Sequence, residues 1–214
     1  IADLNNNNLD DIVFGTDDNK IYVINDDGNI APGFPFTAPD KFRFAPLILE
    51  TVNNILIFAP CDNNRVYALN LSGELEFEIE LNSSISTSLS AMDYDTWPPN
   101  STHHTLIFFG CDNGDIISFN EYGEITVEDN IGSKVVGSII FSDLDYRSDS
   151  TFLAPERIAV NNLGSLFIGE NVSLYQDFNF TYDFPYSSTP IVYDIDNDGD
   201  RDIFSGTTNS IIGI

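Results

Sequence analysis

Short apolar runs separated by polar turns recur along the whole chain. The runs are rich in Ile, Val, Phe and Tyr, and clusters of Asn, Asp and Gly divide them at close intervals. β-Branched and aromatic residues favour strands, and no segment keeps the 3.6-residue apolar period of an amphipathic helix. We therefore expect an all-β fold. The predicted strands include residues 11–16, 20–25, 46–49, 89–92, 139–141 and 190–193.

The two ends of the chain share one sequence pattern. Residues 194–207 align with residues 3–16 position by position, and in both an Asp- and Asn-rich loop leads into an apolar strand. Weaker copies of the turn and strand lie between the two ends. Aligning Gly15, Pro60, Gly110, Val160 and Gly206 gives steps of 45, 50, 50 and 46 residues. The approximate repeats are residues 1–44, 45–86, 87–135, 136–186 and 187–214.

Each repeat has the length of a β-propeller blade, which is a meander of up to four antiparallel strands. A β-sandwich does not require self-similarity at this period, and a parallel β-helix would repeat at a much shorter one. We therefore predict a single β-propeller domain over residues 1–214, built from four-stranded antiparallel blades of about 45–50 residues. The first and last repeats are incomplete and do not complement each other, so we expect a partial propeller.

The charge balance narrows the range of partners. The chain carries 34 Asp and Glu against 8 Lys and Arg, a formal net charge of −26. A nucleic-acid backbone or an anionic membrane surface would be repelled by this charge. No run approaches the roughly 20 apolar residues that a membrane-spanning helix needs. We expect no nucleic-acid binding and no membrane insertion, and the sequence leaves the oligomeric state open.

The loop at residues 194–202 has the spacing of a calcium site. Oxygen-bearing side chains recur at its first, third, fifth and ninth positions, and its seventh residue can offer a main-chain carbonyl. These five residues are Asp194, Asp196, Asp198, Asp200 and Asp202. Calcium takes six to eight oxygen ligands, whereas zinc prefers His and Cys, which this loop lacks. A solvated turn is the alternative, but four carboxylates this close repel one another without a counter-ion.

The other loops follow this pattern to different degrees. The first loop offers two carboxylates, two amides and one main-chain carbonyl in the same positions, so we expect weaker calcium binding there. Its predicted ligands are Asp3, Asn5, Asn7, Leu9 and Asp11. The second loop is too short for a site. The third and fourth loops keep Asp93 with Asp95 and Asp143 with Asp145, and we interpret them as remnants.

The chain resembles the FG-GAP or VCBS repeats of integrin-type β-propellers. The resemblance is carried by the first and last loops, by the strands Ile-Phe-Ser-Gly-Thr and Ile-Val-Phe-Gly-Thr that follow them, and by the segment Gly33–Phe36. The segment Gly-Phe-Pro-Phe is similar to one found in many bacterial members. The resemblance implies structural calcium and an extracellular or cell-surface module for recognition, adhesion or scaffolding, with a protein or carbohydrate ligand. It does not identify that ligand.

A catalytic function is the alternative to a binding module. A propeller domain of a secreted hydrolase or polysaccharide lyase would need paired carboxylates, for which Asp93/Asp95 and Asp143/Asp145 are candidates. Their spacing is equally explained by the remnants of calcium loops, and no nucleophile elbow, P-loop or dinucleotide fingerprint is present. We therefore expect a non-catalytic chain.

Three further features are weaker candidates. Trp97, in a polar insertion, could stack on a sugar or peptide, although a Trp more often packs on its own blade. His103-His104 could bind a metal, although adjacent His residues in a polar loop usually face water. Cys61 and Cys111 occupy equivalent positions of consecutive repeats. Neighbouring blades are roughly 10 Å apart, too far for a disulfide, so we predict two free and mostly buried thiols.

Overall fold

The computed structural model describes residues 1–51, 54–94, 104–142, 144, 155–169 and 179–214. Throughout these ranges the chain forms strands and turns only. None of the described residues belongs to a helix that could span a membrane.

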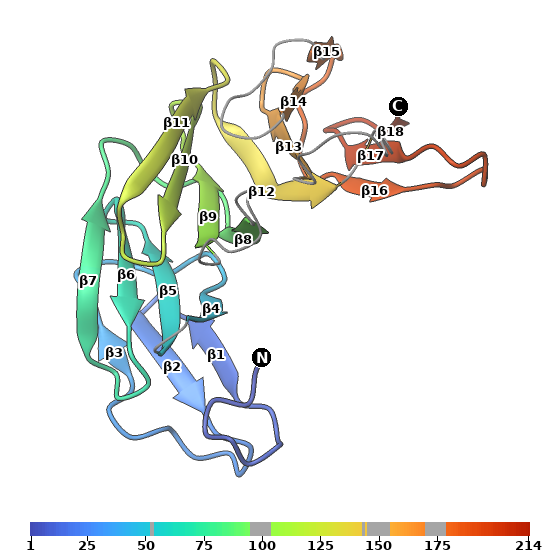
Figure 1. Cartoon of the computed structure of the whole chain (residues 1–214). Helices are drawn as coiled ribbons and strands as arrows, with labels where there is room; N and C mark the ends of the chain where they lie inside the picture. The colour runs from blue at the N-terminus through green and yellow to red at the C-terminus, as the bar shows by residue number, and fades with distance from the viewer. Residues whose placement is uncertain (52–53, 95–103, 143, 145–154, 170–178) are drawn as a thin grey trace. The chain divides into compact units, whose positions relative to one another are not determined.

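The described strands form five sheets, which we name blades 1 to 5 in chain order (Figure 1). Blade 1 holds β1 (Ile12–Gly15), β2 (Lys20–Ile24) and β3 (Phe36–Thr37); blade 2 holds β4 (Leu47–Glu50), β5 (Ile55–Cys61), β6 (Arg65–Leu69) and β7 (Leu75–Glu80). Blade 3 holds β8 (Ser90–Tyr94), β9 (His104–Gly110), β10 (Asp115–Asn120) and β11 (Ile125–Asn130); blade 4 holds β12 (Val135–Ser142), β13 (Glu156–Asn161), β14 (Ser165–Gly169) and β15 (Asn179–Thr181). Blade 5 holds β16 (Ile191–Tyr193), β17 (Asp202–Gly206) and β18 (Ile211–Gly213).

Every blade is an antiparallel meander in which strands adjacent in sequence pair with each other. The predicted all-β class and the four-stranded antiparallel unit are confirmed. The predicted strand at 139–141 is only part of β12, which is longer because its register with β13 shifts between Val136 and Ile140. Gly137, with φ 68°, lies within this irregularity. A search for apolar runs finds the regularly paired part of such a strand and misses the part that contains the bulge.

The chain divides into two compact units, Ile1–Leu89 and Ser90–Ile214. The first contains blades 1 and 2, and the second contains blades 3, 4 and 5. That residues 1–214 form a single domain stays a prediction.

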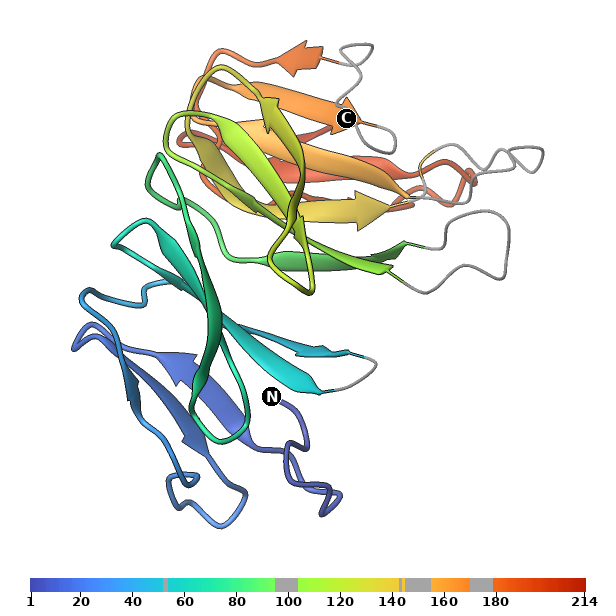
Figure 2. The same cartoon turned by 60° about the vertical axis from the view of Figure 1, so that its left-hand side comes forward.

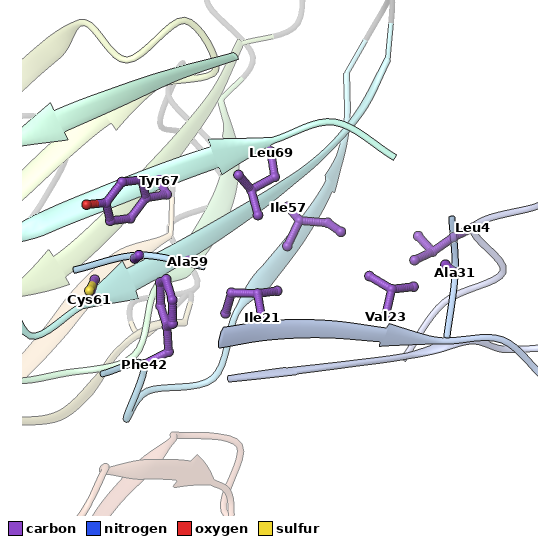
Figure 3. Packing of buried hydrophobic residues seen from close by; sticks show 11 residues of the cluster. Leu4, Ile21, Val23, Ala31, Phe42, Ile57, Ala59, Cys61, Tyr67 and Leu69 are labelled. Atoms are coloured by element: carbon purple, nitrogen blue, oxygen red, sulfur yellow. The ribbon is translucent and has the colours of Figure 1, made fainter. Parts of the chain in front are cut away.

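In the first unit, blades 1 and 2 pack face to face (Figure 2). Ile21 and Val23 of β2 meet Ile57 of β5 and Leu69 of β6, and Figure 3 shows these side chains pointing into one layer between the sheets. Ile21, Ile57 and Leu69 are fully buried. Because side chains alternate along a strand, the same strands present a second set of residues to their opposite faces.

In the second unit, two apolar layers separate the three blades. One joins blades 3 and 4 and includes Phe108, Ile116, Ile139 and Ala159. The other joins blades 4 and 5 and includes Ile158, Val160, Leu166 and Ile203. Both faces of blade 4 are therefore covered, which explains why all six residues of β13 are buried, including the polar Glu156, Arg157 and Asn161.

The outer faces of blades 1 and 5 are apolar and exposed. Ile12 and Phe14 on β1 are 49% and 39% exposed, although Ile57, which has the repeat position of Ile12 in blade 2 and faces blade 1, is fully buried. In blade 5, Ile191, Tyr193 and Ile211 lie on the face opposite the layer with blade 4. These faces have the composition of a blade interface, as expected of a partial propeller.

A close backbone contact joins blades 1 and 2 near the Gly-Phe-Pro-Phe segment. Gly33 has φ 86° and lies against Ser72 and Gly73 in the β6–β7 turn, where φ of Gly73 is 75°. A Cβ on Gly33 would overlap the carbonyl oxygen of Ser72. Glycine is therefore required here by both backbone conformation and space.

This contact predicts different effects for two glycines with the same backbone conformation. Gly28 has φ 83°, and nothing lies within 4 Å of a Cβ placed on it. We expect Gly28→Ala to lower the free energy of unfolding by about 1–2 kcal/mol, the cost of the left-handed conformation. Gly33→Ala should lower it clearly further because blade 2 must also move. Urea unfolding curves would measure both, and equal losses would contradict the contact.

Candidate functional site: the Asp-rich loops

The last Asp-rich loop connects β16 with β17 and brings three carboxylates together. One oxygen from each of Asp194, Asp196 and Asp202 lies within 4.8 Å of the others. Asp194 and Asp202 are partly buried, and Asp196 is exposed. These are the first, third and ninth positions of the predicted ligand set.

The local backbone explains why these side chains converge. Asn197 and Gly199 have φ of 60° and 99°, so the chain reverses sharply in the middle of the loop. Ile195 N donates to Asp202 Oδ2 at 3.1 Å, and Gly199 N donates to Asp194 Oδ2 at 3.2 Å. The loop thus wraps its amide groups around the carboxylates at both of its ends. Amide donors favour the charged form of a carboxylate and hold it in place.

The remaining two predicted residues have other positions. Asp198 Oδ1 accepts the amide hydrogen of Asp200 at 2.9 Å, which fixes the turn, and Asp198 is not in the group of three. Asp200 was predicted to offer its main-chain carbonyl rather than its carboxylate. The structure therefore gathers three of the four predicted carboxylate ligands.

One atom of this cluster indicates that the residues fit a cation. Asp194 Oδ1 is buried and has no hydrogen-bond partner among the described residues. A buried carboxylate oxygen without a partner is unfavourable, and two neighbouring carboxylates make it more so. A hard divalent cation would remove both penalties, because calcium accepts carboxylate oxygens in a flexible shell.

The first loop has the same fold with a different chemistry. Leu4 N donates to Asp11 Oδ2 at 3.0 Å and Asn8 N to Asp3 Oδ2 at 2.7 Å, matching the two bonds in the last loop. Asn6 and Asn8, with φ of 59° and 65°, occupy the positions of Asn197 and Gly199. The sequence alignment of the two loops therefore reflects one backbone conformation.

Amide groups in the first loop take the place of acidic groups in the last. Asn5 Nδ2 donates to Asp11 Oδ1 at 3.3 Å, and Asn7 Nδ2 donates to Asp26 Oδ1 at 2.8 Å. Asp26 N also donates to Asp11 Oδ1, at 3.1 Å. The loop satisfies its own carboxylates, which is a physical reason to expect weaker cation binding there than at residues 194–202.

The fourth loop retains the closing interaction. Leu144 N donates to Glu156 Oε2 at 2.8 Å, and Glu156 is 7% exposed. Glu156 occupies the repeat position of Asp11 and Asp202, four residues before the aligned Val160. No role was predicted for Glu156 from the sequence, although its place at the start of an apolar run was a signal. Asp143 and Asp145 lie outside the described residues.

The other predicted candidates also fall outside this description. Trp97, His103 and Asp95 belong to the range 95–103, and the side chains of Asp93 and His104 are likewise not described. The end of β1 opposite the first loop opens into a shallow hollow of about 460 Å³, lined by Gly15, Thr16, Asp17, Lys41, Phe42 and Arg43. Arg43 Nε lies 2.7 Å from Asp62 Oδ2, so its charge is largely compensated.

We expect the closing carboxylate to stabilise the loop without any metal. Asp11 is fully buried and accepts the amides of Leu4 and Asp26. Asp11→Ala should lower the free energy of unfolding by about 1–3 kcal/mol, because it leaves these donors unpaired. Exposed Asp10 is the matched control. Thermal unfolding in a chelating buffer should separate the two variants, and identical melting temperatures would contradict the proposed role.

Both cysteines are free and buried, as predicted. Cys61 Sγ lies 3.3 Å from the carbonyl oxygen of Asp40. Burial raises the pKa of the Cys111 thiol from 9.0 to about 12, and burial also raises the pKa of Cys61.

This shift predicts that the folded protein resists alkylation. The thiolate is the reactive form, so near pH 9 Cys111 should react with iodoacetamide much more slowly in the folded chain than in urea. The same shift should reduce stability as the pH rises from about 9 towards 12, because only the unfolded state loses the proton over that range. Mass spectrometry of the labelled peptides would measure the rates. Equal rates with and without urea would contradict the assignment.

Comparison with known proteins supports the fold. No protein-family model matches the sequence, and no curated protein matches it. Two crystal structures of BBS1N in complex with ARL6DN, one soaked with mercury and one with lead, match with TM-scores of 0.65 and 0.60 at 12% identity. The matches cover 95% of this chain and 55% and 58% of those chains. The chain has a β-propeller fold and spans little more than half the length of these propellers.

Proposed function

We propose that this chain is a non-catalytic β-propeller module that presents a binding surface to a protein partner, and that calcium holds its Asp-rich loops in shape. The fold supports the first part, since BBS1N, which shares this fold, is in complex with another protein. Propeller blades form a rigid scaffold from which loops can vary independently. The wider proposal of an FG-GAP or VCBS-type adhesion module rests on the sequence resemblance.

The observation that carries the calcium proposal is the buried, unpartnered Asp194 Oδ1 beside Asp196 and Asp202. Calcium would supply positive charge at this point and cross-link both ends of the loop. Asp194, Asp196 and Asp202 would hold it through carboxylates. We place the protein outside the cell, where modules with weak calcium sites work at dissociation constants of about 10⁻⁴–10⁻³ M.

The hydrogen bonds of the cluster favour a structural over a catalytic role. Asp194 and Asp202 each accept a backbone amide, and Asp196 accepts the amide of Asp198 at 3.2 Å. A catalytic acid or nucleophile needs an oxygen directed at a substrate. Here each carboxylate uses one oxygen to hold its own loop in shape, which is the arrangement of a structural cation site.

Calcium should raise the melting temperature of the chain. A ligand at about a hundred times its dissociation constant stabilises the folded state by about 2.7 kcal/mol, which corresponds to roughly 5–10 °C for a protein of this size. Isothermal titration with CaCl₂, and thermal unfolding with CaCl₂, MgCl₂ or a chelator, would measure affinity and stabilisation. We expect a clear response to calcium and a smaller one to magnesium.

Two variants in the same loop sharpen this test. Asp194→Asn removes charge from the carboxylate with the unpartnered oxygen and should abolish most of the response. Asp200→Asn removes the same charge from a residue predicted to use only its carbonyl, and should keep the response. If both variants respond like the unmodified chain, or if calcium has no effect on it, the calcium proposal fails. Release of new reducing ends from polysaccharides would instead support the hydrolase or lyase alternative.

A further inference from the structure

Arg157 is a fully buried cation in the mostly apolar layer between blades 3 and 4. It lies near the start of β13, and its side chain is 1% exposed. Its guanidinium carbon is 5.3 Å from the centre of the Phe108 ring on β9, and Nη2 is 3.5 Å from Asp129 Oδ2 on β11. The Arg157 side chain thus extends from blade 4 across the face of blade 3.

The repeats show that this position is normally isoleucine. Three residues before the aligned Gly, Pro or Val, the five repeats have Ile12, Ile57, Ile107, Arg157 and Ile203. Ile57 and Ile107 are fully buried and Ile203 is 5% exposed. With the 50-residue step from blade 2 to blade 3, Asp129 corresponds to Ile79, which is 6% exposed. By strand pairing the same position is Phe36 in blade 1 and Phe180 in blade 4. Each side of the layer between blades 3 and 4 therefore has a charge where the other repeats have an apolar residue.

The geometry indicates that the Arg157–Asp129 pair contributes little to the free energy of folding. The guanidinium nitrogens and Asp129 Oδ2 form no hydrogen bond among the described residues. The separation of 3.5 Å is longer than in a charge-assisted hydrogen bond. Burial also lowers the pKa of Arg157, which reflects the cost of removing its charge from water. Apolar residues of similar size often stabilise a protein as well as a buried ion pair does.

We propose that Arg157 and Asp129 determine which blade packs on blade 3. Any other blade in the place of blade 4 would present isoleucine to Asp129 and bury an unpaired carboxylate. Blade 4 packed on a blade with isoleucine in the place of Asp129, as blade 2 has, would bury an unpaired guanidinium. Tandem repeats with similar apolar faces are prone to wrong pairing and to exchange between copies. The pair makes such arrangements unfavourable while leaving the correct one neutral.

Single and double replacements by isoleucine test this proposal, since isoleucine is the residue of the other repeats at position 157 and of blade 2 at position 129. Asp129→Ile and Arg157→Ile should each reduce the folding equilibrium constant by roughly tenfold to a thousandfold, since each leaves one buried charge unpaired. The double variant should unfold at the same midpoint urea concentration as the unmodified chain. It should, however, refold from urea with a lower monomer fraction, and the difference should grow with protein concentration. Size-exclusion chromatography with light scattering would measure the monomer fraction.

Two controls distinguish the effect of losing this buried pair from the effect of losing two charges. The double variant Asp112→Asn, Lys134→Gln removes the same two charges from an exposed pair 2.7 Å apart and should refold like the unmodified chain. Exchange of the two residues, Asp129→Arg with Arg157→Asp, should keep a higher monomer fraction than the double isoleucine variant. The proposal is overturned if the double isoleucine variant fails to regain the midpoint, because the pair then acts through stability. It is equally overturned if that variant refolds to the same monomer fraction as the unmodified chain.

Discussion

The structure depends on one constraint: an inner blade must bury both of its faces against neighbouring blades. In β13, Ile158 and Val160 belong to the layer with blade 5, while Ala159 belongs to the layer with blade 3. A strand buried on both sides needs a continuous apolar run rather than an alternating one. Most polar residues therefore lie in the turns at the ends of the blades, and a polar residue inside a strand, such as Arg157 or Asn161 of β13, needs a partner in the neighbouring blade.

The loops before the second strand of a blade share one hydrogen-bonding arrangement. Their amides must be hydrogen-bonded beside a buried strand, and a residue at the start of that strand supplies a carboxylate in blades 1, 4 and 5: Asp11, Glu156 and Asp202. This bond is present whether the loop is rich in Asn, extended, or rich in Asp. We infer that this carboxylate primarily accepts the backbone amides of its loop. In the last loop the additional acidic residues also repel one another, so that this loop needs a cation.

The fold was predictable because its signals are local and repeated. The 45–50-residue step and the Gly, Asn and Asp turns mark the blades, and the alignment of residues 3–16 with 194–207 extends to φ values and hydrogen bonds. The β12 bulge was missed because it depends on the contact of Gly137 with Thr189, which is distant in sequence. Glu156 was missed because an insertion separates it from the start of its loop. Which oxygens of the last loop converge, and which one lacks a partner, depends on side-chain geometry that residue spacing does not specify.

The role of Arg157 can be inferred only when the repeat alignment and the structure are considered together. The sequence alone contains an arginine in an apolar run, which is compatible with an exposed strand end. Burial places it between two blades, and the alignment then shows that its partner also departs from the repeat. A stack of identical faces would gain stability from every possible pairing of blades, so similarity alone cannot specify their order. A pair of complementary charges at two positions that are apolar in the other repeats distinguishes one interface from the others. A wrong neighbour would bury one of these charges without its partner, and the cost of desolvating that charge makes the wrong pairing unfavourable.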